Sequence, residues 1–104
     1  MMLFDWDDNK REKVLRDHGI DFLDAMDVWD DLLRQERLDL RHDYGEDRIQ
    51  TIGKTRLGVL FVVYTERFTH DGDDITRLIS ARLAERDEID QYHTRTFERA
   101  TDYG

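Results

Sequence analysis

Apolar and polar residues alternate at the start of the chain and then change to a helical spacing. Leu3–Trp6 has the alternation of a short strand. Asp7 and Asp8 follow, and their carboxylates suit the first turn of a helix, where backbone N–H groups lack partners. We expect this helix to run from Asp8 to Asp17 and to end at Gly19, because glycine readily adopts the left-handed conformation of a helix cap.

A second helix is predicted between Asp21 and Leu33, because apolar residues recur there at helical spacing. These residues are Phe22, Ala25, Met26, Trp29, Leu32 and Leu33. The opposite face carries the aspartates Asp24, Asp27, Asp30 and Asp31. An aromatic residue at this spacing usually belongs to a core, so we expect Trp29 to be buried against a sheet. The aspartates favour either simple solubility or contact with a basic partner.

After Leu33 apolar residues recur at every second position, and this spacing predicts four strands. They lie at Arg37–Arg41, Arg48–Ile52, Val59–Thr65 and Ile75–Ala81. The third of them is apolar on both faces, as is typical of a central strand that is covered on both sides. Because the connections are short, we expect consecutive strands to pair as antiparallel hairpins.

A final helix is predicted over residues 84–100, followed by a frayed tail at 101–104. The complete order is a short N-terminal strand, two helices, an antiparallel four-stranded meander and a C-terminal helix. Helices that are segregated from a meander in this way indicate the α+β class. With 104 residues, the chain suits one domain that spans residues 1–104.

Charge adds an asymmetry to this picture. The net charge is −9, yet residues 48–82 carry 6 basic and 4 acidic groups, whereas residues 1–47 carry 7 and 15. The absence of cysteine excludes disulfides, thiolate metal sites and cysteine nucleophiles. The N-terminus turns acidic too early for a signal peptide, and the longest apolar run, Val59–Tyr64, is too short for a bilayer. We therefore expect a soluble, cytoplasmic protein.

Several familiar catalytic signatures are missing from the sequence. Gly53 and Gly58 are isolated, so no glycine loop is available to cradle a phosphate. The histidines His18, His42, His70 and His93 are scattered without the spacing of metal ligands. The acidic segment Asp71–Asp74 lacks the glutamate that closes a calcium loop, so a hairpin turn is the better interpretation.

Arginines near the ends of predicted strands are the remaining candidates for chemistry. They are Arg48, Arg67, Arg77 and Arg82. A guanidinium offers forked donors to a phosphate and stays charged near neutral pH, so arginines gathered on one sheet face could stabilise a strained phosphate in RNA cleavage. An arginine at a strand end is more often solvated or paired with a carboxylate, and spacing alone favours that plainer interpretation.

The residues from Phe4 to Tyr92 resemble the BrnT toxin family of bacterial type II toxin–antitoxin systems. The matching segments begin with Phe4–Asp7, His18–Ile20, Gly45–Arg48, Val62–Arg67 and Leu78–Arg82. They continue with the single residues Lys10, Phe22, Ala25, Val28, Gly53, Ala84, Glu88 and Tyr92. The segments follow one another in the order of the family. Val14 and Asp17 depart from it, because the family often has asparagine and lysine there.

The resemblance implies a RelE-like fold, in which a small curved sheet is flanked by helices. It also implies a ribonuclease that needs no metal or other cofactor and that blocks translation. The implied partner is a BrnA antitoxin with a ribbon-helix-helix DNA-binding half, so that contact with DNA is indirect, through the complex that represses the operon. A second hypothesis is an inactive relative that only binds the antitoxin and tunes repression.

Roles for individual residues follow from the resemblance. Arg67 and Arg82 would bind the phosphate and stabilise its charge with help from Arg48, and we expect Arg67 and Arg82 to face one hollow of the sheet. Glu46 or His18 would accept the proton of the attacking hydroxyl. The two residues that could orient RNA are Lys10 and Tyr64. Each role has a structural alternative: Glu46 could close a turn, His18 could accompany a helix end, Lys10 could be a solvated helix residue, and Tyr64 could belong to the core.

Overall fold

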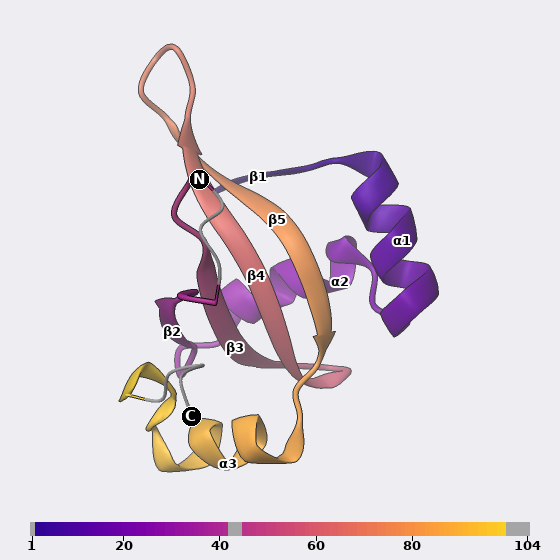
Figure 1. Ribbon diagram of the computed structural model, residues 1–104, viewed down its shortest axis with the longest axis vertical. Coiled ribbons are helices and arrows are strands. Elements are labelled where there is room, and N and C mark those ends of the chain that lie inside the picture. The colour runs from indigo at the N-terminus through magenta and orange to yellow at the C-terminus, as the bar shows by residue number, and fades with distance from the viewer. Residues whose placement is uncertain (1, 42–44, 100–104) are drawn as a thin grey trace.

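A five-stranded sheet forms the body of the computed structural model, which describes residues 2–41 and 45–99 (Figure 1). The strands are β1 (Leu3–Trp6), β2 (Gln35–Leu38), β3 (Ile49–Thr55), β4 (Gly58–Phe68) and β5 (Asp74–Leu83). Their order across the sheet is β1-β5-β4-β3-β2. His42, residues 43–44 and the predicted tail 101–104 lie outside the described residues.

The sheet is mixed, with β1 at one edge. Strands β2, β3, β4 and β5 pair with their sequence neighbours in antiparallel register, whereas β1 pairs with β5 in parallel. The α+β class is therefore confirmed. The sheet has five strands, not the four of the predicted meander, because the N-terminal strand joins its edge. This pairing brings Asp5 opposite Arg77.

Helix α1 (Asp8–His18) has the ends that the sequence predicts. The Asp7 carboxylate accepts a hydrogen bond from the backbone N–H of Asn9 over 2.8 Å. Gly19 adopts a φ of 73° and donates its N–H to the carbonyl of Leu15. An aspartate at the start and a left-handed glycine at the end satisfy backbone groups that the helix itself leaves unpaired.

The second predicted helix is much shorter than expected. The segment forms α2 (Phe22–Ala25) and then a 3-10 helix, η1 (Met26–Asp30). Asp31 ends the helical backbone, since its carboxylate accepts hydrogen bonds from the N–H of Leu33 at 2.9 Å and of Lys54 at 2.7 Å. An aspartate that binds nearby backbone in this way competes with helix continuation. Leu32, predicted to be on the apolar face, is consequently 98% exposed.

The buried amide side chain of Gln35 helps to hold the C-terminal helical region to β2. Helix α3 (Arg86–Thr94) ends at Arg95, and a 3-10 helix, η2 (Phe97–Arg99), follows it. The Gln35 side chain donates to the carbonyl of Tyr92 over 2.9 Å and accepts from the N–H of Phe97 over 3.1 Å. The predicted single helix over residues 84–100 is thus two pieces, and the strand predicted at Arg37–Arg41 begins earlier, at Gln35.

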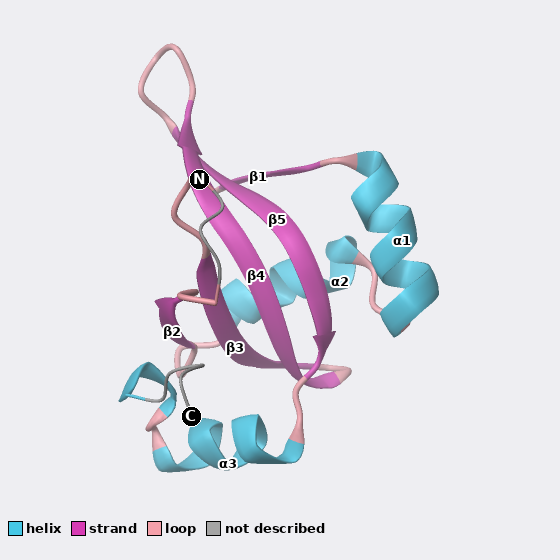
Figure 2. Cartoon of the chain, in the orientation of Figure 1, coloured by secondary structure: helices cyan, strands magenta, loops and turns pink. Residues whose placement is uncertain are grey.

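Two apolar clusters cover opposite faces of the sheet. Figure 2 shows the strands of this sheet and the helices around it. Leu60, Val62 and Tyr64 of β4 belong to the larger cluster with α1 and α2, whereas Phe61 and Val63 belong to the smaller one with α3 and η2. Trp29 is only partly buried at the margin of the larger cluster. Its ring meets Phe4 and Tyr64 edge to face, with centroid distances of 5.2 Å and 5.1 Å.

Strands β4 and β5 lose register at one point. Val63 pairs with Ser80 but Tyr64 pairs with Leu78, so Ile79 is an extra residue on β5. Such a bulge bends its strand and redirects the side chains beside it. Here it separates the half of β5 that pairs with β1 from the half that lies beside α1.

Candidate active site

Three arginines project from one face of the sheet near the start of β5. Arg77 pairs with Thr65 across β5 and β4, and Arg67 lies two residues beyond Thr65 on the same strand. Residues two apart on a strand share a face, so these side chains point the same way. Ile49 of β3 pairs with Tyr64 of β4, so Arg48, the residue before Ile49, lies beside Thr65. Thr65 thus has Arg77 on its β5 side and Arg48 on its β3 side. The helical segment made of α2 and η1 passes behind β5 and β4, on the opposite face (Figure 1).

A hollow of about 160 Å³ lies among these side chains. The residues that line it include Asp7, Lys10, Glu46, Arg48, Thr65, Arg67, Arg77 and Ile79. We call this space the arginine hollow. Among the described residues that form it, four are basic and two are acidic, although the chain as a whole carries a net charge of −9. The arginine hollow is therefore a local cationic site on an acidic protein.

Glu46 lies between two of the arginines. One of its carboxylate oxygens accepts a hydrogen bond from Arg67 Nη2 over 3.3 Å, and the other is 3.7 Å from Arg48 Nε. The Arg67 side chain is 52% exposed and that of Arg48 is 22% exposed. Arg67 is therefore the more open of the two to an incoming anion, and Glu46 holds both guanidinium groups near the hollow.

Arg77 is one of the strand-end arginines expected from the sequence, but the family resemblance gave it no specific role. Its Nη1 donates to Asp5 Oδ2 over 2.6 Å, so the edge strand fixes its position. The cue in the sequence is the acidic residue in the alternating segment Leu3–Trp6. That cue becomes meaningful only once β1 is known to pair with β5, and no local pattern predicts a parallel contact across 72 positions.

A second hollow of about 410 Å³ adjoins the first. Lys10 and Ile79 line both. Its other lining residues are Lys13, Val14, Asp17, His18 and Ser80. The structure thus brings Lys10, Glu46, Arg48 and Arg67 together, and places His18 next to them in this second hollow, which we call the α1 hollow.

Arg82 does not belong to the arginine hollow, so the expectation that it shares a hollow with Arg67 is wrong. It pairs with Phe61, six positions along β4 from Arg67, which corresponds to about 20 Å of extended strand. Its guanidinium donates twice to Glu88, over 2.7 Å and 2.9 Å, and lies 4.1 Å from the centre of the Phe61 ring. The hydrogen bonds to Glu88 raise the pKa of Arg82 above its ordinary value despite partial burial. This arginine joins α3 to the sheet.

Tyr64 lies on the wrong face to orient RNA in the arginine hollow. Its ring is buried in the larger apolar cluster, and its hydroxyl donates to Glu36 over 2.5 Å. Burial and that hydrogen bond raise the pKa of Tyr64 well above its usual range. Burial alone would raise the pKa of Glu36, but hydrogen bonds from Tyr64 and Arg34 outweigh it and lower that pKa. Tyr64 is a core residue, which is the structural alternative stated above.

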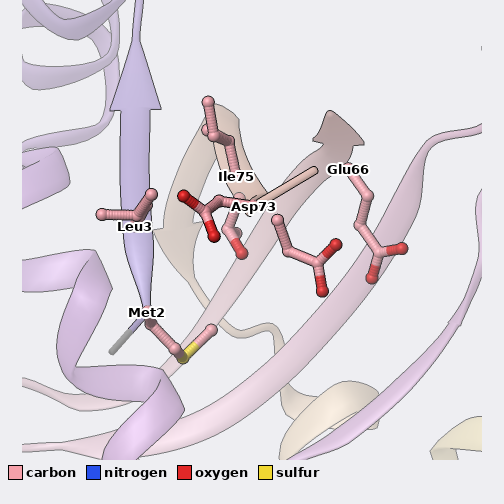
Figure 3. A pocket seen from close by; sticks show the side chains of 7 residues that line it. Met2, Leu3, Glu66, Asp73 and Ile75 are labelled. Atoms are coloured by element: carbon pink, nitrogen blue, oxygen red, sulfur yellow. The ribbon is translucent and has the colours of Figure 1, made fainter. Parts of the chain in front are cut away.

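The hollow between β1 and the β4–β5 hairpin is larger, at about 480 Å³, but has the opposite charge (Figure 3). Of the described residues around it, Glu66, Asp73 and Asp74 are acidic and none is basic. Met2 and Leu3 form its apolar wall. Its carboxylates would repel a phosphate, so it is a poor candidate for an RNA site.

Two further features bear on the function classes. Within residues 2–41 and 45–99, no group of three or more histidine, aspartate or glutamate side chains is arranged to hold a metal ion. None of the helices in the described part of the chain has both the length and the apolar character that crossing a membrane requires.

Comparison with known proteins identifies the family. No curated protein matches the chain. A family model described as the ribonuclease toxin, BrnT, of type II toxin-antitoxin systems matches residues 6–88. The match covers most of the 104 residues and includes Lys10, Glu46, Arg48, Arg67 and Arg77. The chain belongs to the BrnT family of ribonuclease toxins of type II toxin–antitoxin systems.

Proposed function

We propose that the chain is a metal-independent endoribonuclease that inhibits translation, with the arginine hollow as its active site. The observation that carries this proposal is the convergence of Lys10, Arg48, Arg67 and Arg77 around one hollow that also contains a carboxylate. These cations come from four separate parts of the chain: α1, β4, β5 and the segment before β3.

The reaction would begin when a ribose 2′-hydroxyl attacks the adjacent phosphorus. The new bond joins O2′ to phosphorus, and the bond from phosphorus to the 5′ oxygen of the next nucleotide breaks. The products are a 2′,3′-cyclic phosphate and a free 5′-hydroxyl. One proton leaves the attacking hydroxyl, and one proton from water joins the departing 5′ oxygen. Such a reaction needs a base and a stabiliser of negative charge on the phosphoryl oxygens.

Arg67 and Arg77 would stabilise the phosphoryl oxygens, because a guanidinium presents two parallel donors to a phosphate. Arg67 is the more exposed of the two, with 52% of its side chain accessible against 26% for Arg77. Arg48 and Lys10 would add positive charge at the rim. RNA binding depends strongly on such cations, which explains how an acidic protein could hold an anionic substrate.

Glu46 is the proposed proton acceptor, since it lies inside the arginine hollow whereas His18 lies in the neighbouring one. A phosphate that displaces Glu46 from Arg67 would leave the carboxylate beside the reacting hydroxyl. The same ion pairs support the second candidate function. If Glu46 holds Arg67 and Arg48 too tightly, the chain would only bind its antitoxin and tune repression.

The proposed partner is a BrnA-like ribbon-helix-helix antitoxin that neutralises the toxin, with DNA contacted only through that complex. A type II system implies an antitoxin and an RNA substrate. We also propose a RelE-like fold, because a small sheet flanked by helices on both faces suits that superfamily.

Induced expression in a bacterial host tests the proposal. Growth should stop when the wild-type chain is expressed alone, and growth should continue with Arg67→Ala or Arg77→Ala at equal protein levels. Arg56→Ala is the matched control, because Arg56 is an exposed arginine with its own ion pair to Asp24, away from the hollow. Growth arrest by the wild type and by Arg56→Ala, but not by Arg67→Ala or Arg77→Ala, supports the nuclease. No arrest by any of the chains, together with antitoxin binding by all, supports the binding module.

A further inference from the structure

The arginine hollow and the α1 hollow adjoin each other beside α1. Lys10 and Ile79 line both hollows, so the boundary between them consists of one lysine and one isoleucine. Ile79 is the extra residue of the bulge between β4 and β5. An added residue at this point changes the direction of β5 and leaves Ile79 between the two spaces.

The α1 hollow has the chemistry of a nucleobase site. Val14 and Ile79 supply an apolar floor, and Val14 is itself buried at 7% exposure. Lys13, His18 and Ser80 supply polar groups around it, and His18 also offers an exposed aromatic ring. Unstacked bases of single-stranded RNA pack on aromatic or apolar side chains and form hydrogen bonds along their edges.

The two hollows differ in volume and in the kind of residue that lines them. The arginine hollow measures about 160 Å³ and is bounded mainly by charged groups, as suits a phosphate. The α1 hollow measures about 410 Å³ and has an apolar floor, as suits a base and its ribose. Its single carboxylate, Asp17, accepts a hydrogen bond from Lys13 over 3.2 Å and lies 3.6 Å from Arg16. That charge is therefore balanced before RNA arrives.

We infer that the α1 hollow receives the nucleotide next to the scissile phosphate, so that the substrate is single-stranded RNA that crosses Ile79 between two subsites. This inference rests on the proposed nuclease function and adds a base-binding subsite to it. Lys10 would contact the backbone where the strand passes from one hollow to the other. Duplex RNA would bind poorly, because a paired base cannot enter the α1 hollow.

Binding of short RNA to the full chain tests this subsite. The probes are inorganic phosphate and four 2′-O-methyl tetranucleotides, one for each base, which cannot be cleaved. Ser80→Leu fills the α1 hollow, and Lys13→Gln removes one cation from it. Arg56→Gln is the control, since it removes one positive charge at an exposed arginine that pairs with Asp24 outside both hollows.

Ser80→Leu and Lys13→Gln should weaken binding of the best tetranucleotide about tenfold, the order of one stacked base. Their affinity for inorganic phosphate should match that of the wild type, and Arg56→Gln should bind both kinds of probe as the wild type does. If Ser80→Leu does not fold, as judged by circular dichroism, Lys13→Gln carries the test alone.

Tetranucleotide binding by both variants at the wild-type level would overturn the subsite, and the proposed nuclease would stand if Arg67→Ala still abolished cleavage. Normal RNA binding combined with lost antitoxin binding would also overturn it and assign the α1 hollow to the protein partner. Wild-type cleavage by Arg67→Ala would instead remove the proposed active site and the subsite with it.

Discussion

Arg82 and Glu88 form a two-pronged ion pair, with N–O distances of 2.7 Å and 2.9 Å, that fastens α3 to β5. The Glu88 side chain is only 9% exposed, and it also accepts the backbone N–H of Glu85 over 2.8 Å. One carboxylate thus closes the first turn of α3 and anchors it to the sheet. Arg82 has a packing role here that strand-end position alone does not reveal.

Replacement of Arg82 by alanine should therefore lower the free energy of unfolding by about 1–3 kcal/mol, because the buried Glu88 carboxylate loses two charged donors. Urea denaturation of Arg82→Ala, Glu88→Gln and the double variant measures the coupling between the two residues. Loss of RNA cleavage by Arg82→Ala with unchanged stability would contradict this account and return Arg82 to the catalytic role that the family resemblance implies.

Glu46→Gln should move substrate binding and turnover in opposite directions. The change removes the negative charge that pairs with Arg67 and Arg48, so affinity for a non-cleavable RNA should rise. The same change removes the proposed base, so the cleavage rate of bound RNA should fall about 100-fold or more. Single-turnover cleavage and equilibrium binding separate the two effects.

Glu66→Gln is the control for Glu46→Gln, since Glu66 lines the acidic hollow beside β1 instead. It should leave both binding and cleavage near the wild-type values. A faster rate in Glu46→Gln would mean that the carboxylate only restrains the arginines, and His18 would then be the better candidate for the base.

The local parts of the fold could be predicted from the sequence, and the parts that depend on distant contacts could not. Asp7 and Gly19 cap α1 from within a few residues, so that helix was predicted at both ends. The second helix stops at Asp31, whose carboxylate binds the N–H of Lys54 and the hydroxyl of Tyr92, 23 and 61 positions away. No periodicity within residues 21–33 contains that information.

The candidate site divides in the same way. The segment around Glu46 and Arg48 and the end of β4 with Arg67 were selected through family resemblance, and the structure brings them together. Arg77 was among the strand-end arginines but received no role in the site, because its place depends on the parallel pairing of β1 with β5. Arg82 was selected for the same reason as Arg67, but the register sets it opposite Phe61.

The ion pair between Arg11 and Asp21 should make stability depend on pH in the acid range. Hydrogen bonds from Arg11 lower the pKa of Asp21 below its usual value, against the opposing effect of burial. A carboxyl whose pKa is lowered by folding stabilises the protein above its unfolded pKa of about 3.9, and the contribution is lost as pH falls through the folded value. Stability should therefore decline below about pH 4.

Asp21→Asn isolates this effect, because asparagine can still cap α2 through the N–H of Leu23. Above pH 5 the free energy of unfolding of the wild type should exceed that of Asp21→Asn by about 1 kcal/mol, and this gap should shrink towards pH 3. Urea midpoints across this range measure the gap. A gap that does not change with pH would contradict the ion-pair explanation, and Arg11→Ala should remove the gap at every pH.

Trp29→Ala should cost about 2–3 kcal/mol of stability, less than the 3–5 kcal/mol typical of a fully buried tryptophan. The ring is only partly buried, but it meets Phe4 and Tyr64 and lies 5.2 Å from the Arg34 guanidinium. Leu32→Ser, at a leucine that is 98% exposed, should change stability by less than about 0.5 kcal/mol. Thermal unfolding of both variants compares the two positions, and equal losses would contradict the shortened second helix.

Cleavage of a labelled single-stranded RNA by the purified chain in the presence of EDTA tests the central claim most directly. The wild type should produce fragments that end in a 2′,3′-cyclic phosphate. Arg67→Ala should cleave about 100–1000-fold more slowly, as expected for loss of a charge-stabilising donor, while Arg56→Ala cleaves at the wild-type rate. Equal rates for wild type and Arg67→Ala, or cleavage that EDTA abolishes, would contradict a metal-independent nuclease centred on the arginine hollow.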